Sequence, residues 1–178
     1  KDKYDEINLL EGVREYGQDC SLHFEGKPLG LIQCKHSIHN TRRISQPECA
    51  KEIVKFVLHY LVDNTLIYDP KSFTYYFAVS FGFSKPALKL ITDFNIEILK
   101  RTELKEWTEA VINDNVELKH LNYNNIECDL KTVLASITVE KITPQDLDTL
   151  LNTDGFQSII KTFFEVRMVI ESEPVEKL

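Results

Sequence analysis

The chain has 178 residues, of which 43% are hydrophobic and 28% are charged, and its formal net charge at pH 7 is −7. These values are typical of a globular domain with a proper core, and no apolar run reaches the ~20 residues of a membrane span. The acidic balance argues mildly against a general nucleic-acid binder. Four cysteines without framework spacing, and no signal peptide, lead us to expect a cytoplasmic location.

The first half of the chain alternates between predicted helices and strands. Residues 2–11 are predicted to form a short helix, and residues 13–24 and 31–36 are typical of two strands that pair as a hairpin. Ser45–Glu48 has the composition of a helix start, and apolar residues then recur at three- and four-residue spacing up to Leu61. The aromatic run 72–83 predicts a strand buried on both faces of a central sheet.

The second half continues the same alternation. A helix is expected to begin near Ser84, residues 100–125 have a helical pattern, and the second half of 130–142 is predicted to be a strand. Thr143 and Pro144 predict another helix start. We therefore expect one α/β domain, a mixed central β-sheet flanked by helices, with a core at about 13–100 and an extension at about 101–178. Because the sequence opens without Met, we expect it to be part of a larger protein.

A carboxylate, an amide and an amine are brought together by the predicted hairpin. Gln33 and Lys35 lie on one face of the second strand, about 6.6 Å apart along it, while Cys34 lies on the other face. Pairing with the first strand places Asp19 beside both. This combination of oxygen ligands and a nearby cation is the kind of arrangement that metal-dependent phosphodiester hydrolysis requires.

Asp19 with Gln33-Cys34-Lys35 resembles the Asp…Gln-x-Lys variant of the PD-(D/E)xK nuclease superfamily, as in Mrr-like restriction endonucleases and nuclease domains fused to bacterial antiphage NTPases. The resemblance covers about residues 13–100. A looser one, over residues 146–164, is to the segment that closes such nuclease domains. The resemblance of the motif implies a restriction-endonuclease-like fold and a metal-dependent DNA endonuclease activity. It also implies that the chain is an effector domain of a prokaryotic defence protein, with an NTPase or sensor region elsewhere in that protein. A homo-oligomer is possible in this family.

The resemblance implies a Mg²⁺ (or Mn²⁺) site. Its expected ligands are the Asp19 carboxylate, the Gln33 amide oxygen and the backbone carbonyl of Cys34, and Lys35 would orient the attacking water or stabilise negative charge. This set is one acid short of the usual number. We expect Glu6 to supply that acid, with Glu11 and Asp5 as alternatives.

Basic residues are concentrated around the motif, so the net negative charge of the whole chain argues less strongly against nucleic-acid binding there. Residues 26–51 contain five Lys or Arg and one acid, a local charge of +4 before histidines are counted. The expected nucleic-acid-binding residues are Lys27, His36, His39, Arg42 and Arg43, since Arg in particular binds phosphate bidentately.

Other interpretations of the same residues stay open. The hairpin could hold a structural ion pair within a non-catalytic nuclease-fold module that binds nucleic acid or protein. A zinc site of Cys20, Cys34, His36 and His39 lacks the usual ligand spacing, and we expect Cys20 and Cys34 to be core cysteines. A Cys-His peptidase using Cys34 with His36, or Cys49 with His59, lacks an evident orienting group and oxyanion hole.

Overall fold

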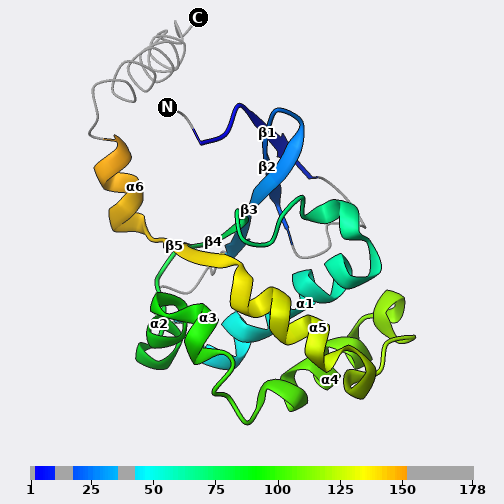
Figure 1. The fold of residues 1–178 in the computed structure, drawn as a ribbon. Coiled ribbons are helices and arrows are strands. Elements are labelled where there is room, and N and C mark those ends of the chain that lie inside the picture. Colours follow the sequence, from blue (N-terminus) through cyan, green and yellow to red (C-terminus); the bar gives the residue numbers. More distant parts are fainter. Residues whose placement is uncertain (1–2, 11–17, 36–42, 152–178) are drawn as a thin grey trace, which may run out of the picture. The chain divides into compact units, whose positions relative to one another are not determined.

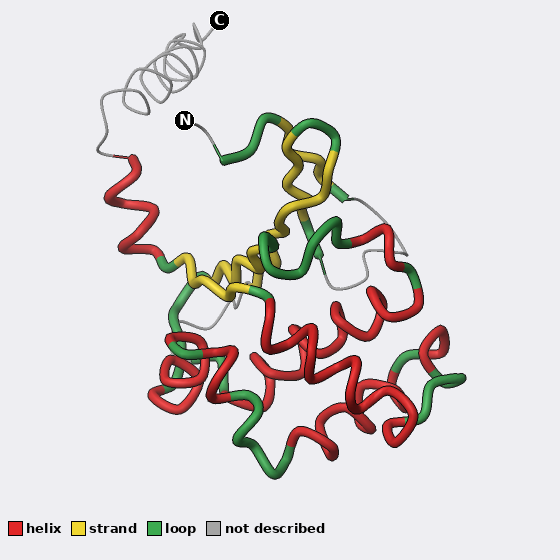
Figure 2. Tube along the Cα trace, in the orientation of Figure 1, coloured by secondary structure: helices red, strands yellow, loops and turns green. Residues whose placement is uncertain are grey.

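The computed structural model describes residues 3–10, 18–35 and 43–151, and the chain divides into two compact units, Lys1–Ile142 and Thr143–Leu178 (Figures 1 and 2). The first unit has a five-stranded mixed sheet with helices, which confirms the predicted α/β class. In the second unit the described element is helix α6 (Pro144–Leu151), which begins where the sequence predicted. None of the described helices is long and apolar enough to span a bilayer.

The five strands lie in the sheet in chain order, so the motif strands are central neighbours. They are β1 (Glu6–Leu9), β2 (Cys20–Phe24), β3 (Lys27–Lys35), β4 (Thr74–Val79) and β5 (Thr138–Ile142). The first three pair antiparallel, while β3–β4 and β4–β5 pair parallel. Parallel neighbours need long crossover connections, and helices supply them here.

Helices make both crossovers. Helix α1 (Gln46–Val62) and the 3₁₀ helix η1 (Asn64–Leu66) connect β3 to β4. Between β4 and β5 the chain forms α2 (Lys85–Thr92), α3 (Phe94–Glu97), α4 (Leu104–Asp114), the 3₁₀ helix η2 (Val116–Leu118) and α5 (Tyr123–Ser136). Helices α4 and α5 contact α1, and Figure 1 shows these three helices together on one side of the sheet.

The predicted hairpin is confirmed, with a tighter turn than the sequence indicated. β2 and β3 are joined by Glu25 and Gly26 alone, and both residues have positive φ, 51° and 72°. Two successive positive φ values are the signature of the tight turns whose twist matches paired strands, and Gly adopts them without strain.

The predicted N-terminal helix is wrong, because Glu6–Leu9 pair with β2 as strand β1. Ile7 and Leu9 remain 63% and 74% exposed, so backbone pairing with β2, rather than burial of an apolar face, holds this strand. Such a strand leaves little apolar signal in a sequence, since hydrophobic periodicity reports burial.

The core lies between the sheet and α1. The rings of Phe56 and Phe73 stack at 5.4 Å, and Tyr75 meets Phe56 edge-on at 5.9 Å. Helix α1 begins within the predicted Ser45–Glu48 start, and Ser45 caps it in a capping box with Glu48. On the opposite face Tyr76 is only half-buried, so β4 is fully buried on the helical face alone, and the expectation of burial on both faces is wrong.

Residues before β1 cover part of that opposite face. Lys3 Nζ donates to Thr74 Oγ1 at 2.7 Å, and the hydroxyl of Tyr4 lies 3.3 Å from that of Tyr76. A Cβ on Gly30 would lie 2.9 Å from both the Tyr4 hydroxyl and the Thr74 carbonyl oxygen. This position therefore needs glycine because two chain segments approach its Cα closely.

Candidate functional site

Asp19 immediately precedes β2, and its carboxylate joins the end of that strand to β3. Its backbone N–H donates to the Ile32 carbonyl at 2.9 Å. Its Oδ2 accepts from Gln33 Nε2 at 2.9 Å and from the backbone N–H of Cys34. The Asp19 carboxylate thus accepts a hydrogen bond from the backbone of β3 at the point where the pairing of β2 and β3 ends. It lies beside Gln33, as the sequence predicted.

Gln33 is 5% exposed, and its two ends have different surroundings. Nε2 donates to Asp19 Oδ2 and, at 3.3 Å, to the Cys34 carbonyl oxygen. Oε1 is buried and accepts no hydrogen bond from any described residue. Because an amide must place its donors toward a carboxylate and a carbonyl, this orientation is fixed by chemistry. A hard oxygen is left without a donor.

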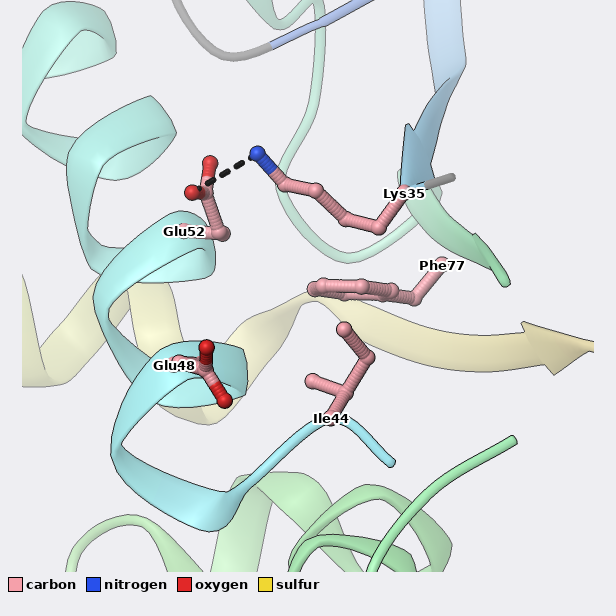
Figure 3. Close-up of a pocket in the computed structure, with 5 residues that line it drawn as sticks. All are labelled: Lys35, Ile44, Glu48, Glu52 and Phe77. Atoms are coloured by element: carbon pink, nitrogen blue, oxygen red, sulfur yellow. Dashed lines mark ion pairs between the residues drawn. The ribbon is translucent and has the colours of Figure 1, made fainter. Parts of the chain in front are cut away.

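Strand alternation puts Lys35 on the same side of β3 as Gln33. Its side chain extends toward α1 (Figure 3). Its Nζ lies 2.8 Å from Glu52 Oε1, and the two side chains are 35% and 26% exposed. Sequence reasoning missed Glu52. The available signal was a pair of acids, Glu48 and Glu52, spaced four residues apart on a helix that otherwise presents apolar residues to the sheet.

A small pocket of about 140 Å³ lies beside this ion pair, lined by Lys35, Ile44, Glu48, Glu52 and Phe77 (Figure 3). Oε2 of Glu48 accepts from the Ser45 N–H at 2.9 Å and from its hydroxyl at 2.6 Å, so this oxygen is engaged in capping α1. The pocket has room for a few water molecules or a hydrated ion, but it is smaller than the usual pocket for a drug-sized ligand.

The acid expected from the N-terminus does not reach Asp19. Glu6 lies opposite His23 on β2, three residues beyond Cys20, which is about 10 Å along the strand. Asp5 is farther along the same segment and accepts from the Glu25 N–H at the hairpin turn, at 2.9 Å. Neither Glu6 nor Asp5 can act as a ligand beside Asp19, because their segment runs antiparallel to β2 and places both residues toward the hairpin turn. Glu11 lies outside the described residues.

The site contains oxygen atoms of the type that magnesium prefers. Within the described ranges no three His, Cys, Asp or Glu side chains are close enough to hold a metal ion. Mg²⁺, however, is commonly bound by one or two carboxylates together with waters and substrate phosphates. Asp19 Oδ2 and the Cys34 carbonyl are oxygens of that kind, but both accept from Gln33 Nε2, so Oε1 could join them around one cation only after the Gln33 amide turned over.

The cysteine residues follow a different pattern from the one expected. Cys34 is exposed and Cys20 is half-buried, so Cys34 is not a core cysteine. Burial, followed by the negative charge of Asp19, raises the pKa of both thiols. Cys49 is fully buried, and burial raises the pKa of its thiol strongly. Raised pKa values suppress the thiolate that a peptidase nucleophile requires. The zinc alternative also depended on His36 and His39, which lie outside the described residues.

The expected nucleic-acid-binding residues do not form one described patch. Lys27 lies at the opposite end of β3 from Lys35, about 26 Å away by strand rise, with its Nζ 4.6 Å from the centre of the Tyr68 ring. Arg43 is exposed just before α1. His36, His39 and Arg42 lie outside the described residues. Lys27 is therefore too far from Asp19 to contact the same phosphate.

The chain matches no protein-family model, no curated protein and no solved structure.

Proposed function

We propose that this chain is a metal-dependent endonuclease domain that hydrolyses phosphodiester bonds in DNA. The observation that carries the proposal is the arrangement of Asp19, Gln33 and Lys35 at one end of β2 and β3, with an unpartnered buried oxygen on Gln33. The sheet begins with three antiparallel strands and continues with parallel ones, and α1 makes the first crossover. This order supports the α/β fold that the motif's resemblance implies.

Each residue has a role that its surroundings support. Asp19 and the Cys34 carbonyl would hold Mg²⁺ or Mn²⁺, and the Gln33 amide, whose Nε2 faces both oxygens in the structure, would turn over to present Oε1 to the ion. The ion would neutralise phosphate charge and activate a water. The Lys35 ammonium orients the nucleophilic water and stabilises negative charge on the phosphate. Glu52, at 2.8 Å, holds that ammonium in place until substrate arrives.

The biological context that we propose for this activity rests only on the resemblance of the Asp19 and Gln33-Cys34-Lys35 motif to the nuclease superfamily. In that context the chain is the cytoplasmic effector domain of a prokaryotic antiphage protein, whose NTPase or sensor region controls it, and cleavage of both DNA strands would require a homo-oligomer.

A second candidate function is a non-catalytic nuclease-fold module that binds nucleic acid or protein. It is favoured by the Lys35–Glu52 ion pair, which engages the amine in the absence of substrate. It is also favoured by the lack of a three-acid cluster in the described part of the chain. Both features are compatible with a hairpin whose polar residues only stabilise the fold.

Cleavage of supercoiled plasmid separates the two candidates. The chain is incubated with plasmid and Mg²⁺ or Mn²⁺, and Lys35→Ala is compared with Lys71→Ala, an exposed lysine elsewhere. The nuclease proposal predicts cleavage by the wild type and by Lys71→Ala, loss in Lys35→Ala, and loss with EDTA. Equal cleavage by Lys35→Ala, or none by any form, contradicts it.

A further inference from the structure

Strand β1 lies at the edge of the sheet and holds apolar side chains in solvent. It pairs with β2 on one side, and no other described strand lies along its outer side. Ile7 and Leu9 are 63% and 74% exposed. β1 contains one charged residue, Glu6, and no Pro, although charges and Pro are what usually protect a free edge from pairing with another chain. The outer side of β1 is therefore open to a further strand.

The pairing of β1 with β2 defines which backbone groups point outward. The Leu10 N–H donates to the Asp19 carbonyl at 2.9 Å, and the next pair along is Leu9 opposite Cys20. Hydrogen-bonded and non-hydrogen-bonded pairs alternate along antiparallel strands. Because the Leu10 pair is hydrogen-bonded, Leu9 and Ile7 direct their N–H and C=O groups away from β2. Two donors and two acceptors thus face the open edge.

These outward groups fit a second copy of the same strand. With an antiparallel copy centred on Asn8, Ile7 lies opposite Leu9 of the other copy, and all four outward groups of each strand form hydrogen bonds. Ile7 and Leu9 share one face of β1, so each exposed apolar side chain contacts an apolar one. A dyad at Ile7 would instead put Leu9 opposite the acidic Asp5. The register about Asn8 is therefore the one that matches apolar with apolar residues.

We propose that β1 is a dimer interface, through which two copies of this chain join their five-stranded sheets into one continuous sheet. A single pair of four-residue strands buries less than the ~1,200 Å² that stable interfaces usually bury. The dimer is therefore weak, with a dissociation constant in the micromolar range or above. The interface follows from β1 alone, while its consequence for DNA rests on the proposed function.

Pairing about Asn8 brings two candidate sites to one side of the joined sheet. The dyad is perpendicular to the sheet, so α1 of both copies lies on the same side. Asp19 is opposite Leu10, two residues from the dyad along the strand, and one strand further in. At ~3.4 Å per residue and ~4.8 Å per strand, the two Asp19 residues lie about 20 Å apart. This is less than one turn of duplex DNA, about 34 Å, so a single duplex can contact both sites.

Sedimentation velocity over a concentration series tests the interface. The wild type should shift from monomer toward dimer as its concentration rises. Leu9→Lys places a charge against Ile7 of the other copy, and the change occurs twice per dimer by symmetry. We therefore expect its dissociation constant to be at least about 10-fold weaker, with circular dichroism showing that the fold is kept.

Val116→Lys is the matched control, because Val116 is 79% exposed and lies on η2. It should dimerise like the wild type. A wild type that stays monomeric at every concentration would overturn the proposal, and so would equal dimerisation of Leu9→Lys and Val116→Lys.

Disulfide trapping tests the register. Asn8 lies opposite its own copy in a non-hydrogen-bonded pair, where side chains approach most closely. With the exposed thiols removed by Cys34→Ser and Cys128→Ser, Asn8→Cys should form a covalent dimer on oxidation. Ile7→Cys is the control and should form little, since Ile7 lies opposite Leu9. Equal trapping of the two variants, or none of Asn8→Cys, would overturn this register.

Plasmid cleavage with Mg²⁺ or Mn²⁺ separates the interface from the proposed function. If both hold, the wild type converts supercoiled plasmid to linear DNA, whereas Leu9→Lys mainly nicks one strand. Equal linear product from the two would overturn the pairing of sites. If the wild type does not cleave, the proposed function fails, while sedimentation and trapping still decide whether β1 is the interface.

Discussion

Asp19→Ala removes one carboxylate that accepts two N–H groups, and the cost of the change can be worked out from their surroundings. Gln33 Nε2 is the more expensive partner, because Gln33 is 5% exposed and water cannot easily replace the lost acceptor. The Cys34 N–H belongs to an exposed residue and can turn to solvent. A hydrogen bond to a charged group contributes about 1.5–3 kcal/mol. Counting the Gln33 bond in full and little for the solvent-accessible Cys34 N–H, we expect a total loss of about 2–3 kcal/mol.

For a chain of this length that loss corresponds to a Tm lower by about 4–12 °C, measured by circular dichroism at pH 7. Asp19→Asn retains an acceptor oxygen and should lose less than half as much stability. It nevertheless removes the charge, so it should abolish Mn²⁺ binding. A Tm of Asp19→Ala equal to that of the wild type would refute the joining role of this side chain.

Three further predictions concern α1 and the exposed thiol. Ser45→Ala removes the cap of α1 and should cost about 1 kcal/mol in urea denaturation; an unchanged midpoint would contradict the cap. Burial, aided by Lys55, lowers the pKa of His59, so its proton is bound more readily in the unfolded chain. Stability should therefore fall as pH drops below ~6.5, and less steeply in His59→Gln; parallel pH curves would be inconsistent with this. Burial and then Asp19 raise the pKa of Cys34, so Asp19→Asn should speed its alkylation by iodoacetamide at pH 7.5, followed by peptide mass spectrometry, and an unchanged rate would disprove the coupling.

The sequence predicted those parts of the fold whose local signals agree with tertiary burial. The Gly and Pro punctuation between the two motif strands led to the hairpin, and Ser45 with Pro47 led to the start of α1. It also predicted that Asp19 would lie beside Gln33. In each case a turn or a cap reinforced the hydrophobic pattern.

Features set by long-range pairing escaped prediction. β1 buries almost no apolar side chain, so its strand character comes from the β2 edge it meets rather than from its own residues. Expecting Glu6 on a helix beside Asp19 followed from that error. Glu52 was missed because its contact with Lys35 depends on how α1 crosses the sheet, which no local pattern specifies.

Cys34 shows a subtler limit. Alternation correctly placed it on the face of β3 opposite Gln33 and Lys35. Alternation says nothing, however, about whether that face is covered. The helices that contact α1 lie on the other side, and Cys34 is left exposed.

Mn²⁺ binding measured by isothermal titration calorimetry on the wild type and on Asp19→Asn tests the central claim most directly. The account predicts one weak site per chain in the wild type and its loss in Asp19→Asn, with the fold of the variant confirmed by circular dichroism. Equal binding by the two forms, or no binding by the wild type, would contradict a divalent-cation site built on Asp19 and Gln33.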